Sequence, residues 1–227
     1  MDREQHIELL HQSVVKWNAY RDNNPGAPID LSGANLFGWE LVGANLSGAD
    51  LSSVNLNEAN LAGANLAGAA LCKAYLNAAN LSCANLGGAN LTKAELFAAR
   101  LGGANLGGAT LEYAFLGQAS IESANLRKAN LRQANFMGAK LVGSVLEQAI
   151  LTGADLRTAD LSGATLDGAQ ANAAYMGLTV LVDTNLRNTA GLDNVIHSAP
   201  SEIGGATLQS SGQLPNGFLQ GCEQLSG

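Results

Sequence analysis

The sequence predicts an all-β solenoid, in which a parallel β-helix of about eight four-sided coils follows a helical cap and precedes a short irregular or helical segment. Two observations carry this prediction. Every fifth residue from Leu31 to Leu166 is apolar, 26 of these 28 residues being leucine, and outward-facing substitutions recur at multiples of 20 residues. We expect the cap and lead-in in residues 1–28, the β-helix in 29–188 and the last segment in 189–227.

The first element is a predicted helix over residues 3–21. Its apolar residues at helical spacing are Ile7, Leu10, Val14 and Trp17. The stretch "NNPGAP" ends it, because proline and glycine stop helices. A stack of coils leaves open core and unpaired strand groups at its ends. We therefore expect the helix to cover the first coil near Trp39, which fills an inward slot normally held by alanine. An amphipathic helix that docks a partner is the alternative.

The β-helix is predicted from a unit of five residues. Alanine stands two residues before 26 of the 32 centres between Leu31 and Leu186. Five residues of α-helix rotate by about 500°, so the leucines would form no stripe, and a straight strand alternates with period two. The Ala and Leu of one unit do fit one face of a strand. The chain must therefore turn a corner between units and wind into a coil with Ala and Leu inside.

The number of sides follows from the spacing of outward-facing residues. Tyr75, Phe115 and Tyr175 are separated by 40 and 60 residues, and Phe37 and Phe97 by 60. Multiples of 20 indicate four five-residue sides per coil. Eight coils at the strand spacing of about 4.8 Å give a rod roughly 38 Å long. The large apolar residues should fill its core, among them Leu46, Leu66, Leu86, Leu106, Leu126 and Phe136.

One side of the predicted coil is centred on Leu36 and every twentieth residue after it, and we call it the aromatic face. One interpretation is an exposed apolar patch that docks a protein. The other is that stacked aromatic rings stabilise neighbouring coils or support a packed tail. The residues of this candidate protein-binding face are Phe37, Tyr75, Phe97, Phe115, Met137 and Tyr175, with Tyr113 at the adjoining corner.

A second side, centred on Leu46 and every twentieth residue after it, is smooth and uncharged, and we call it the asparagine face. Its small corner residues include Gly68, Gly88 and Gly108. We expect its asparagine column to support the corners. That column consists of Asn45, Asn65, Asn85, Asn105 and Asn125.

Composition excludes several function classes. A net charge of −7 without a run of either sign gives no basic patch for nucleic acid. No stretch approaches 18 apolar residues, so no membrane span is expected, and the start "MDREQHIELL" lacks the regions of a signal peptide. The three cysteines do not have the spacing of a metal site or a redox motif, and an odd number of cysteines is typical of a reducing compartment. We expect a soluble cytoplasmic protein.

The repeat carries no recognisable catalytic or metal-binding pattern. All three histidines, His6, His11 and His197, lie outside it, so it lacks the commonest general base and metal ligand. Its carboxylates are scattered, with Asp155 and Asp160 on adjacent sides. The stretch "GGANLGG" holds corner glycines rather than a phosphate loop. We therefore predict that the protein is not an enzyme and has no catalytic residues, cofactor or metal.

The stretches "ANLAGANLAGAA" and "ADLRTADLSGA" resemble the A(D/N)Lxx units of pentapeptide repeat proteins. This resemblance spans residues 29–188 and implies a right-handed quadrilateral β-helix. The lead-in also resembles that of several bacterial members. Residues 189–227 resemble the segment that joins such repeats to a TIR-type signalling domain in some bacterial proteins. A cap, a homodimer contact and the stub of a longer protein all remain open for this last segment.

Two function classes remain. The preferred one is a protein-interaction scaffold that binds an unidentified protein through an outer face, including the recognition part of a TIR-linked signalling protein. The other, implied by the resemblance, is a DNA mimic that interacts with gyrase or topoisomerase, as in quinolone resistance. Mimicry needs a phosphate-like negative field. Residues 29–188 hold 12 acidic and 9 basic residues, and the projecting loops of the plasmid-borne members are absent. We expect no direct nucleic-acid binding.

Overall fold

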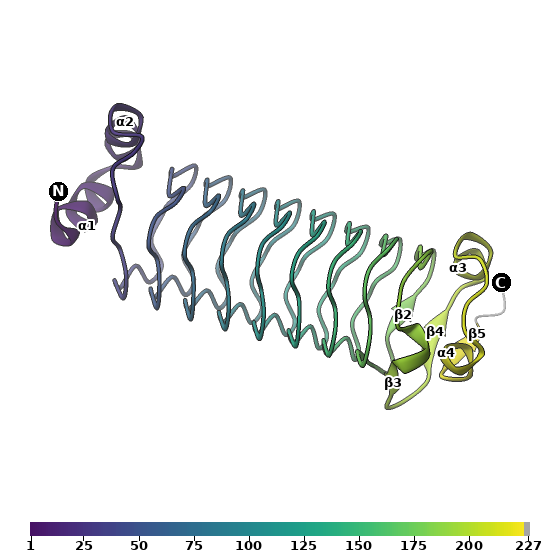
Figure 1. The fold of residues 1–227 in the computed structure, drawn as a ribbon. Helices are drawn as coiled ribbons and strands as arrows, with labels where there is room; N and C mark the ends of the chain where they lie inside the picture. The colour runs from purple at the N-terminus through teal and green to yellow at the C-terminus, as the bar shows by residue number, and fades with distance from the viewer. Residues whose placement is uncertain (225–227) are drawn as a thin grey trace.

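The computed structural model describes residues 1–224 and shows a rod of stacked coils with helices at its N-terminal end and a mixed helix and strand region at the other (Figure 1). Parallel bridges join residues 20 positions apart, from Asp30 and Asp50 at the start to Gln170 and Ala190 at the end. One such bridge occurs every five residues, so each coil has four sides. The four-sided β-helix predicted from the 20-residue spacings is therefore confirmed.

The backbone of one unit explains why five residues repeat. The Leu31 N–H donates to the Asp50 carbonyl at 2.8 Å, which joins one coil to the next. The Ala34 N–H donates to the Leu31 carbonyl at 3.1 Å, which closes a turn at the corner. The residue before that alanine, Gly33, has a φ of 61°. Every corresponding corner to residue 188 also has a positive φ, whether or not it is glycine. A left-handed residue thus turns the chain after each short side.

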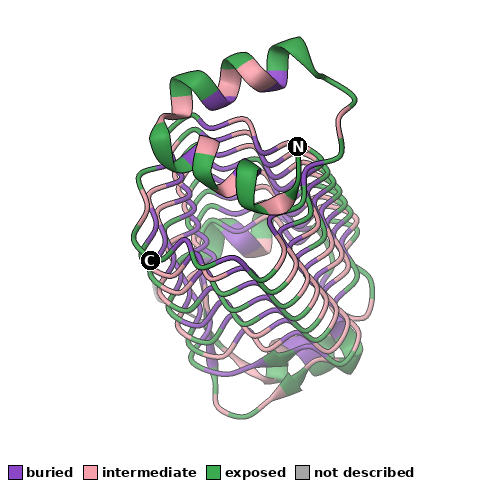
Figure 2. Cartoon of the chain, turned by 90° about the vertical axis from the view of Figure 1, so that its left-hand side faces the viewer, coloured by how far each residue is buried: buried purple, intermediate pink, exposed green. Residues whose placement is uncertain are grey.

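Leucine and alanine from all four sides fill the inside of the rod. The predicted core residues, Leu46, Leu66, Leu86, Leu106, Leu126 and Phe136, are each buried. Figure 2 looks along the rod and shows buried positions facing its interior in coil after coil. Ser144 replaces an inward alanine, and its hydroxyl donates to the Leu141 carbonyl at 2.7 Å. A polar side chain is tolerated there because it is hydrogen-bonded.

The N-terminal cap consists of two helices, α1 (Arg3–Gln12) and α2 (Val14–Asn23), so the prediction of one helix over residues 3–21 is wrong. Ser13 separates them. It is extended, and its hydroxyl accepts the N–H groups of Val15 at 3.2 Å and Lys16 at 3.4 Å. Serine competes for backbone donors in this way at helix starts. The apolar residues keep helical spacing across Ser13, so the sequence pattern did not show that the helix is interrupted there.

Helix α2 occupies the hydrogen-bonding groups that the first coil would otherwise leave open. The Trp17 indole N–H donates to the Asn45 carbonyl at 2.9 Å, and the Asn18 side-chain oxygen accepts the Asn45 N–H at 2.8 Å. The Arg21 guanidinium donates to the Ser47 carbonyl at 2.6 Å. These side chains replace a preceding strand, so the open edge is covered.

The predicted cap residues take different positions. Trp17 and Leu10 are buried, whereas Ile7 and Val14 are only partly buried. Trp39 is partly exposed and lies against the His11 ring, with 4.8 Å between ring centroids. The cap therefore reaches Trp39 through α1. Two polar residues that the apolar pattern did not select, His6 and Arg21, are also buried.

Residues after 188 continue the parallel ladder. β1 (Tyr175–Met176) pairs with β3 (Ile196–His197), and β2 (Val180–Leu181) pairs with β4 (Ser201–Ile203), which pairs in turn with β5 (Cys222–Gln224). The short helices η1 (Leu192–Asn194), α3 (Gly205–Ser210) and α4 (Asn216–Gln220) lie between or after these strands. The expected irregular or helical segment thus also contains strands. Main-chain pairing with the last coil needs no five-residue pattern, so the sequence did not reveal it.

Hydroxyl groups in and next to α3 close this end of the core. The Thr207 hydroxyl accepts the Thr184 N–H at 2.9 Å and donates to the Leu181 carbonyl at 2.5 Å. The Ser211 hydroxyl accepts the Leu186 N–H at 3.0 Å. In earlier coils the corresponding leucine N–H donates to the next coil. Both ends of the β-helix are therefore covered by helical segments whose side chains replace a missing coil.

Candidate protein-binding face

The candidate binding residues lie on the outside of one side of the rod, as their spacing requires. Six of them belong to two columns, one just before and one just after the inward core residue of each unit, and Tyr113 stands at the adjoining corner. All of them are exposed, with exposed fractions of 39–52%. These residues are Phe37, Tyr75, Phe97, Tyr113, Phe115, Met137 and Tyr175.

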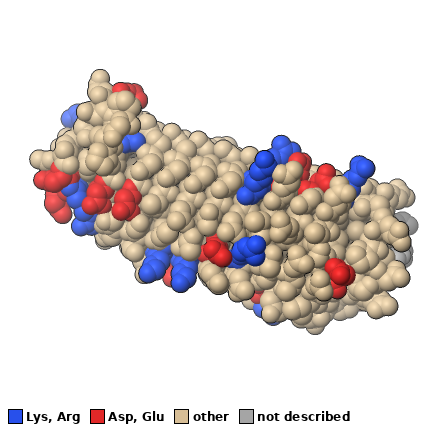
Figure 3. Space-filling model, in the orientation of Figure 1, with Lys and Arg blue, Asp and Glu red and all other residues tan. Residues whose placement is uncertain are grey.

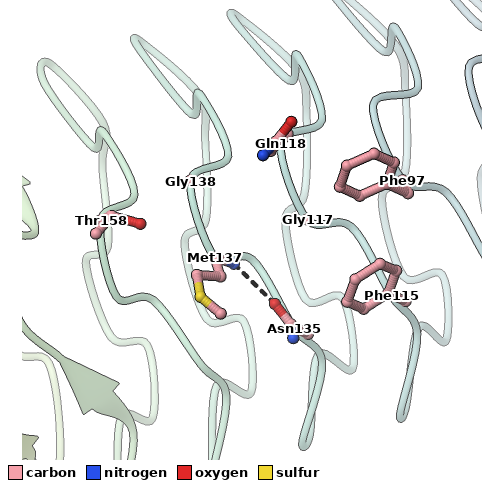
Figure 4. Close-up of a pocket in the computed structure, with 8 residues that line it drawn as sticks. All are labelled: Phe97, Phe115, Gly117, Gln118, Asn135, Met137, Gly138 and Thr158. Carbon is pink, nitrogen blue, oxygen red and sulfur yellow. Dashed lines mark hydrogen bonds between the residues drawn. The ribbon is translucent and has the colours of Figure 1, made fainter.

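The structure brings only part of this set together. Phe97 and Phe115 stack nearly parallel, with ring centroids 5.8 Å apart and an interplanar angle of 14°. Met137 lies beside them across a shared depression (Figure 4). Phe37 and Tyr175 are each three coils away from this pair in the register of the ladder. The aromatic face is therefore a compact cluster with separate rings towards both ends.

Glycine at position 117 makes room for the cluster. A Cβ atom there would lie 3.2 Å from the Phe115 Cζ atom and 3.4 Å from the Phe97 Cδ2 atom. The first distance is shorter than ordinary carbon–carbon contact of about 3.5–4.0 Å. Gly117 thus leaves bare backbone beneath the two rings, and a side chain at this position would displace them.

The rings form one wall of a pocket of about 240 Å³. Figure 4 shows Phe97 and Phe115 on one side of it and Met137, Gly138 and Thr158 on the other. Small-molecule sites typically measure about 300–1,000 Å³. The pocket is smaller than that range, which favours occupation by a single apolar side chain. Its lining residues are Phe97, Phe115, Gly117, Gln118, Asn135, Met137, Gly138 and Thr158.

Polar groups at the rim can orient a peptide. The Asn135 side-chain oxygen accepts the Met137 N–H at 2.9 Å, and no residue that the structure describes accepts from its amide nitrogen. Gln118 contributes a second side-chain amide. Amide groups of this kind can pair with the backbone of an approaching chain. Sequence reasoning missed both residues, because polar residues at these slots are common throughout the repeat.

Some charged groups on the aromatic face are paired or hydrogen-bonded. Arg157 contacts Asp155 at 2.6 Å and holds the pKa of that carboxyl group below its usual value through a side-chain hydrogen bond. Glu95 accepts a hydrogen bond from Asn77 at 3.1 Å. At the adjoining corner, the Lys93 ammonium lies 5.8 Å from the centroid of the Tyr113 ring. On the face of the molecule that Figure 3 shows, small groups of charge are separated by wide uncharged surface.

The exposed apolar column continues past the regular repeat. Ile196 pairs with Tyr175 in the parallel ladder and is exposed, as is Leu178 at the neighbouring corner. The sequence pattern did not select either residue. Ile196 lies beyond the last five-residue unit, and only the strand register places it in this column.

Other parts of the described chain offer little chemistry. Residues 1–224 contain no group of three or more His, Cys, Asp or Glu side chains that could hold a metal ion. Burial raises the pKa of the Cys222 thiol to about 11, so it remains protonated and unreactive near neutrality. Over the same residues, every helix is too short or too polar to cross a membrane.

Comparison with known families gives one clear match. A family model described as pentapeptide repeats matches residues 29–66, 59–96, 99–138 and 139–177, in eight copies. These residues make up more than half of the chain. A comparison with curated proteins gives no significant match.

Several solved structures are similar to this chain. HetL, a pentapeptide repeat protein involved in heterocyst differentiation regulation from Nostoc sp. strain PCC 7120, is 29% identical over 78% of this chain and 90% of its own, with a TM-score of 0.41. Rfr23 from Cyanothece 51142 is 33% identical over 47% of this chain and 63% of its own, with a TM-score of 0.37. QnrB1, a plasmid-mediated fluoroquinolone resistance protein, is 16% identical over 87% of this chain and 90% of its own, with a TM-score of 0.52. The likeness to QnrB1 is one of fold alone.

Proposed function

This chain belongs to the pentapeptide repeat family, and from that premise we propose that it is a non-enzymatic scaffold that binds a protein partner through the aromatic face. The observation that carries the proposal is the exposed cluster of Phe97, Phe115 and Met137 around one pocket. Aromatic residues and methionine are enriched at protein interfaces. The proposed partner inserts a large apolar side chain into this pocket.

Three further features support a protein as the ligand. The pocket is too small for a typical cofactor, yet apolar side chains continue outward from it along the rod. Buried aromatic anchors that fill pockets usually dominate binding energy at protein interfaces. One ion pair on this side, Asp155 with Arg157, is already formed, so a partner would leave neither charge without its counterion.

A purely structural role for the rings is the competing interpretation. The stacking of Phe97 on Phe115 joins two neighbouring coils and contributes about 0.5–1.5 kcal/mol. It does not account for Met137, which faces the same pocket from another coil, or for the bare backbone at Gly117. Stability and binding therefore have to be measured on the same variants.

The first step of the test identifies what touches the pocket. A photoreactive phenylalanine analogue replaces Phe97 in one full-length protein and Val142 in another, and both are irradiated in extracts of the native host. Val142 is exposed on a different side of the rod. We expect a protein that crosslinks from position 97 and not from position 142. Equal crosslinking from both positions would contradict the assignment of the face.

The second step measures affinity for the crosslinked partner. We expect replacement of Tyr75, Phe97 and Phe115 by serine to weaken binding at least tenfold, which is about 1.4 kcal/mol, because the anchor pocket loses one wall. The matched control replaces Val42 and Val142 by serine and should bind like the natural protein. Circular dichroism establishes that each variant is folded. Unchanged affinity of a folded triple variant would overturn the proposal.

The DNA-mimic alternative remains a prediction that one assay decides. The β-helix carries only three more acidic than basic residues, 12 against 9 over residues 29–188. Two ion pairs occur among the described residues, Arg127 with Glu147 and Arg157 with Asp155, each at 2.6 Å. We expect micromolar protein to leave the supercoiling activity of purified gyrase unchanged, with or without a quinolone. Protection or inhibition would favour the gyrase-interacting function instead.

A further inference from the structure

The imidazole of His6 is buried without a hydrogen-bond partner. Only 2% of His6 is exposed, and neither ring nitrogen has a partner among the residues that the structure describes. Its neighbours are the rings of Trp17 and Tyr20, with centroids 6.1 Å and 6.0 Å away. Burial of a polar group without a partner costs free energy, and a charge there costs far more. The site therefore holds a neutral ring and disfavours a protonated one.

The carboxylates nearest to His6, Asp2 and Asp30, form no hydrogen bond with its ring. The charged and titratable groups on the elements packed around it are the N-terminal amine, Asp2, Arg3, Tyr20, Arg21 and Asp30. Asp2 accepts the Gln5 N–H at 2.9 Å, as part of the α1 capping box. Asp30 accepts both the N–H and the hydroxyl of Ser32, at 2.9 Å and 2.7 Å. Arg21 adds a second buried cation to the cap.

The environment of His6 determines how the stability of the docked cap depends on pH. Burial is the main cause that lowers the pKa of His6 from its ordinary 6.5, and the N-terminal amine adds to it, while the backbone of Asp30 and the carboxylates of Asp2 and Asp30 only partly oppose it. A lowered pKa means that the undocked cap binds a proton more readily than the docked one. The stability of the docked cap is then complete above pH 6.5 and is lost as the pH falls towards the lowered value.

His6 lies where the cap is attached to the rod. It touches Trp17, and the indole of Trp17 donates to the Asn45 carbonyl of the first coil. Asn18 and Arg21, which hold the same coil, lie on the same helix as Trp17. A charge on His6 therefore acts directly on the side chains that cover the open end of the β-helix.

We propose that α1 and α2 form a pH-dependent lid, and that protonation of His6 releases this lid from the first coil while the remaining coils stay folded. Release exposes the Asn45 N–H and carbonyl groups and the Ser47 carbonyl. Unpaired strand groups of this kind can pair with another chain. The device is separate from the aromatic face, which lies on a side of the rod rather than at its end.

Hydrogen exchange of the full-length protein tests the lid. Backbone amides of residues 3–23 and of the interior coil 89–108 are compared at pH 7.5 and pH 5.0, each corrected for its intrinsic exchange rate. We expect the opening equilibrium of residues 3–23 to rise by up to tenfold per pH unit below pH 6.5, as the release of one proton requires. The interior coil should keep its protection at both pH values.

Two variants isolate His6. His6→Phe keeps an aromatic ring and removes the titration, so its cap should stay protected at pH 5.0. His11→Phe makes the same change at the exposed histidine of that helix and keeps a ring against Trp39, so it should behave like the natural protein. The proposal is wrong if the natural cap shows no acid-dependent opening, if His6→Phe opens to the same extent, or if the interior coil opens in parallel.

A second measurement covers the case in which His6→Phe does not fold. The chain contains three histidines, so NMR can follow each imidazole separately through a pH titration. We expect the His6 signal to titrate below pH 6.5 over the same range in which residues 3–23 lose protection. Loss of protection at a pH unrelated to the His6 titration would overturn the lid.

Discussion

Asn105 shows how one side chain supports both its own corner and the neighbouring coils. Its side-chain oxygen accepts the Gly107 N–H at 3.2 Å and an amide hydrogen of Asn125 at 2.9 Å, while its nitrogen donates to Asn85 at 2.9 Å. A Cβ atom at position 107 would lie 3.2 Å from that oxygen. The asparagine column supports the corners as the sequence predicted. The pattern did not show that Gly107 keeps space for it.

At the same scale, we expect the rod to be destabilised both by a smaller side chain in the leucine slot and by a larger one in the alanine slot. Leu106→Ala should lower the free energy of unfolding by about 2–5 kcal/mol, because it leaves a cavity. Ala104→Leu should lower it by about 1–3 kcal/mol, because both slots are completely filled. Urea unfolding measures both. The control Gln148→Ala, at an exposed corner, should change it by less than about 0.5 kcal/mol, and equal effects of all three variants would contradict this account of the core.

Among the elements, the regular coils and a helical cap at the N-terminal end were predictable, but the contacts through which the caps close the rod were not. Each inward Leu and Ala repeats the same requirement, so even the exceptions Ile121 and Phe136 keep the register visible. The caps act through single polar side chains such as Asn18 and Thr207, whose partners are backbone groups far away in the sequence. Such residues do not recur at a regular spacing, so the sequence pattern does not identify them. The rim of the candidate pocket escaped prediction for the same reason.

The hydroxyl groups of the C-terminal cap give a test at this scale. Thr207→Val combined with Ser211→Ala removes the groups that accept the Thr184 and Leu186 N–H donors and leaves those donors buried. We expect a loss of about 1–3 kcal/mol per unsatisfied group and faster exchange of these two amides in NMR. Ser210→Ala is the control, because Ser210 is exposed. Unchanged exchange at Thr184 and Leu186 would show that α3 does not close the ladder.

At the scale of the whole molecule, each coil is a repeated unit whose folding depends on its two neighbouring coils and not on its place along the rod. Each coil pairs only with its neighbours 20 residues away, as Asn85 does with Asn65 and Asn105. Stability in such an arrangement is approximately a sum over units and their interfaces. The cytoplasmic location and the bacterial source remain predictions, since neither follows from this architecture.

A pair of deletions tests whether one whole coil can be removed without disturbing the others. Removal of residues 49–68 takes out one complete coil and should leave a shorter, cooperatively folded rod with a modestly lower melting temperature. Removal of residues 65–67 takes out only three residues but breaks the order of inward and corner positions, so we expect a much larger loss. Circular dichroism melts compare the two. The whole-molecule account fails if the shorter deletion is the better tolerated.

The left-handed corners have a consequence for how this surface arose. Gly, Asn and Asp adopt a positive φ at little steric cost, whereas this backbone conformation destabilises other residues by roughly 1–2 kcal/mol. Tyr113 holds such a corner with a φ of 58° and an exposed ring. The β-helix would fold more easily with glycine at that position, so folding does not explain the choice of tyrosine. Seventeen other non-glycine residues hold such corners, so it is the exposed ring at the edge of the aromatic face, and not the backbone angle, that distinguishes Tyr113.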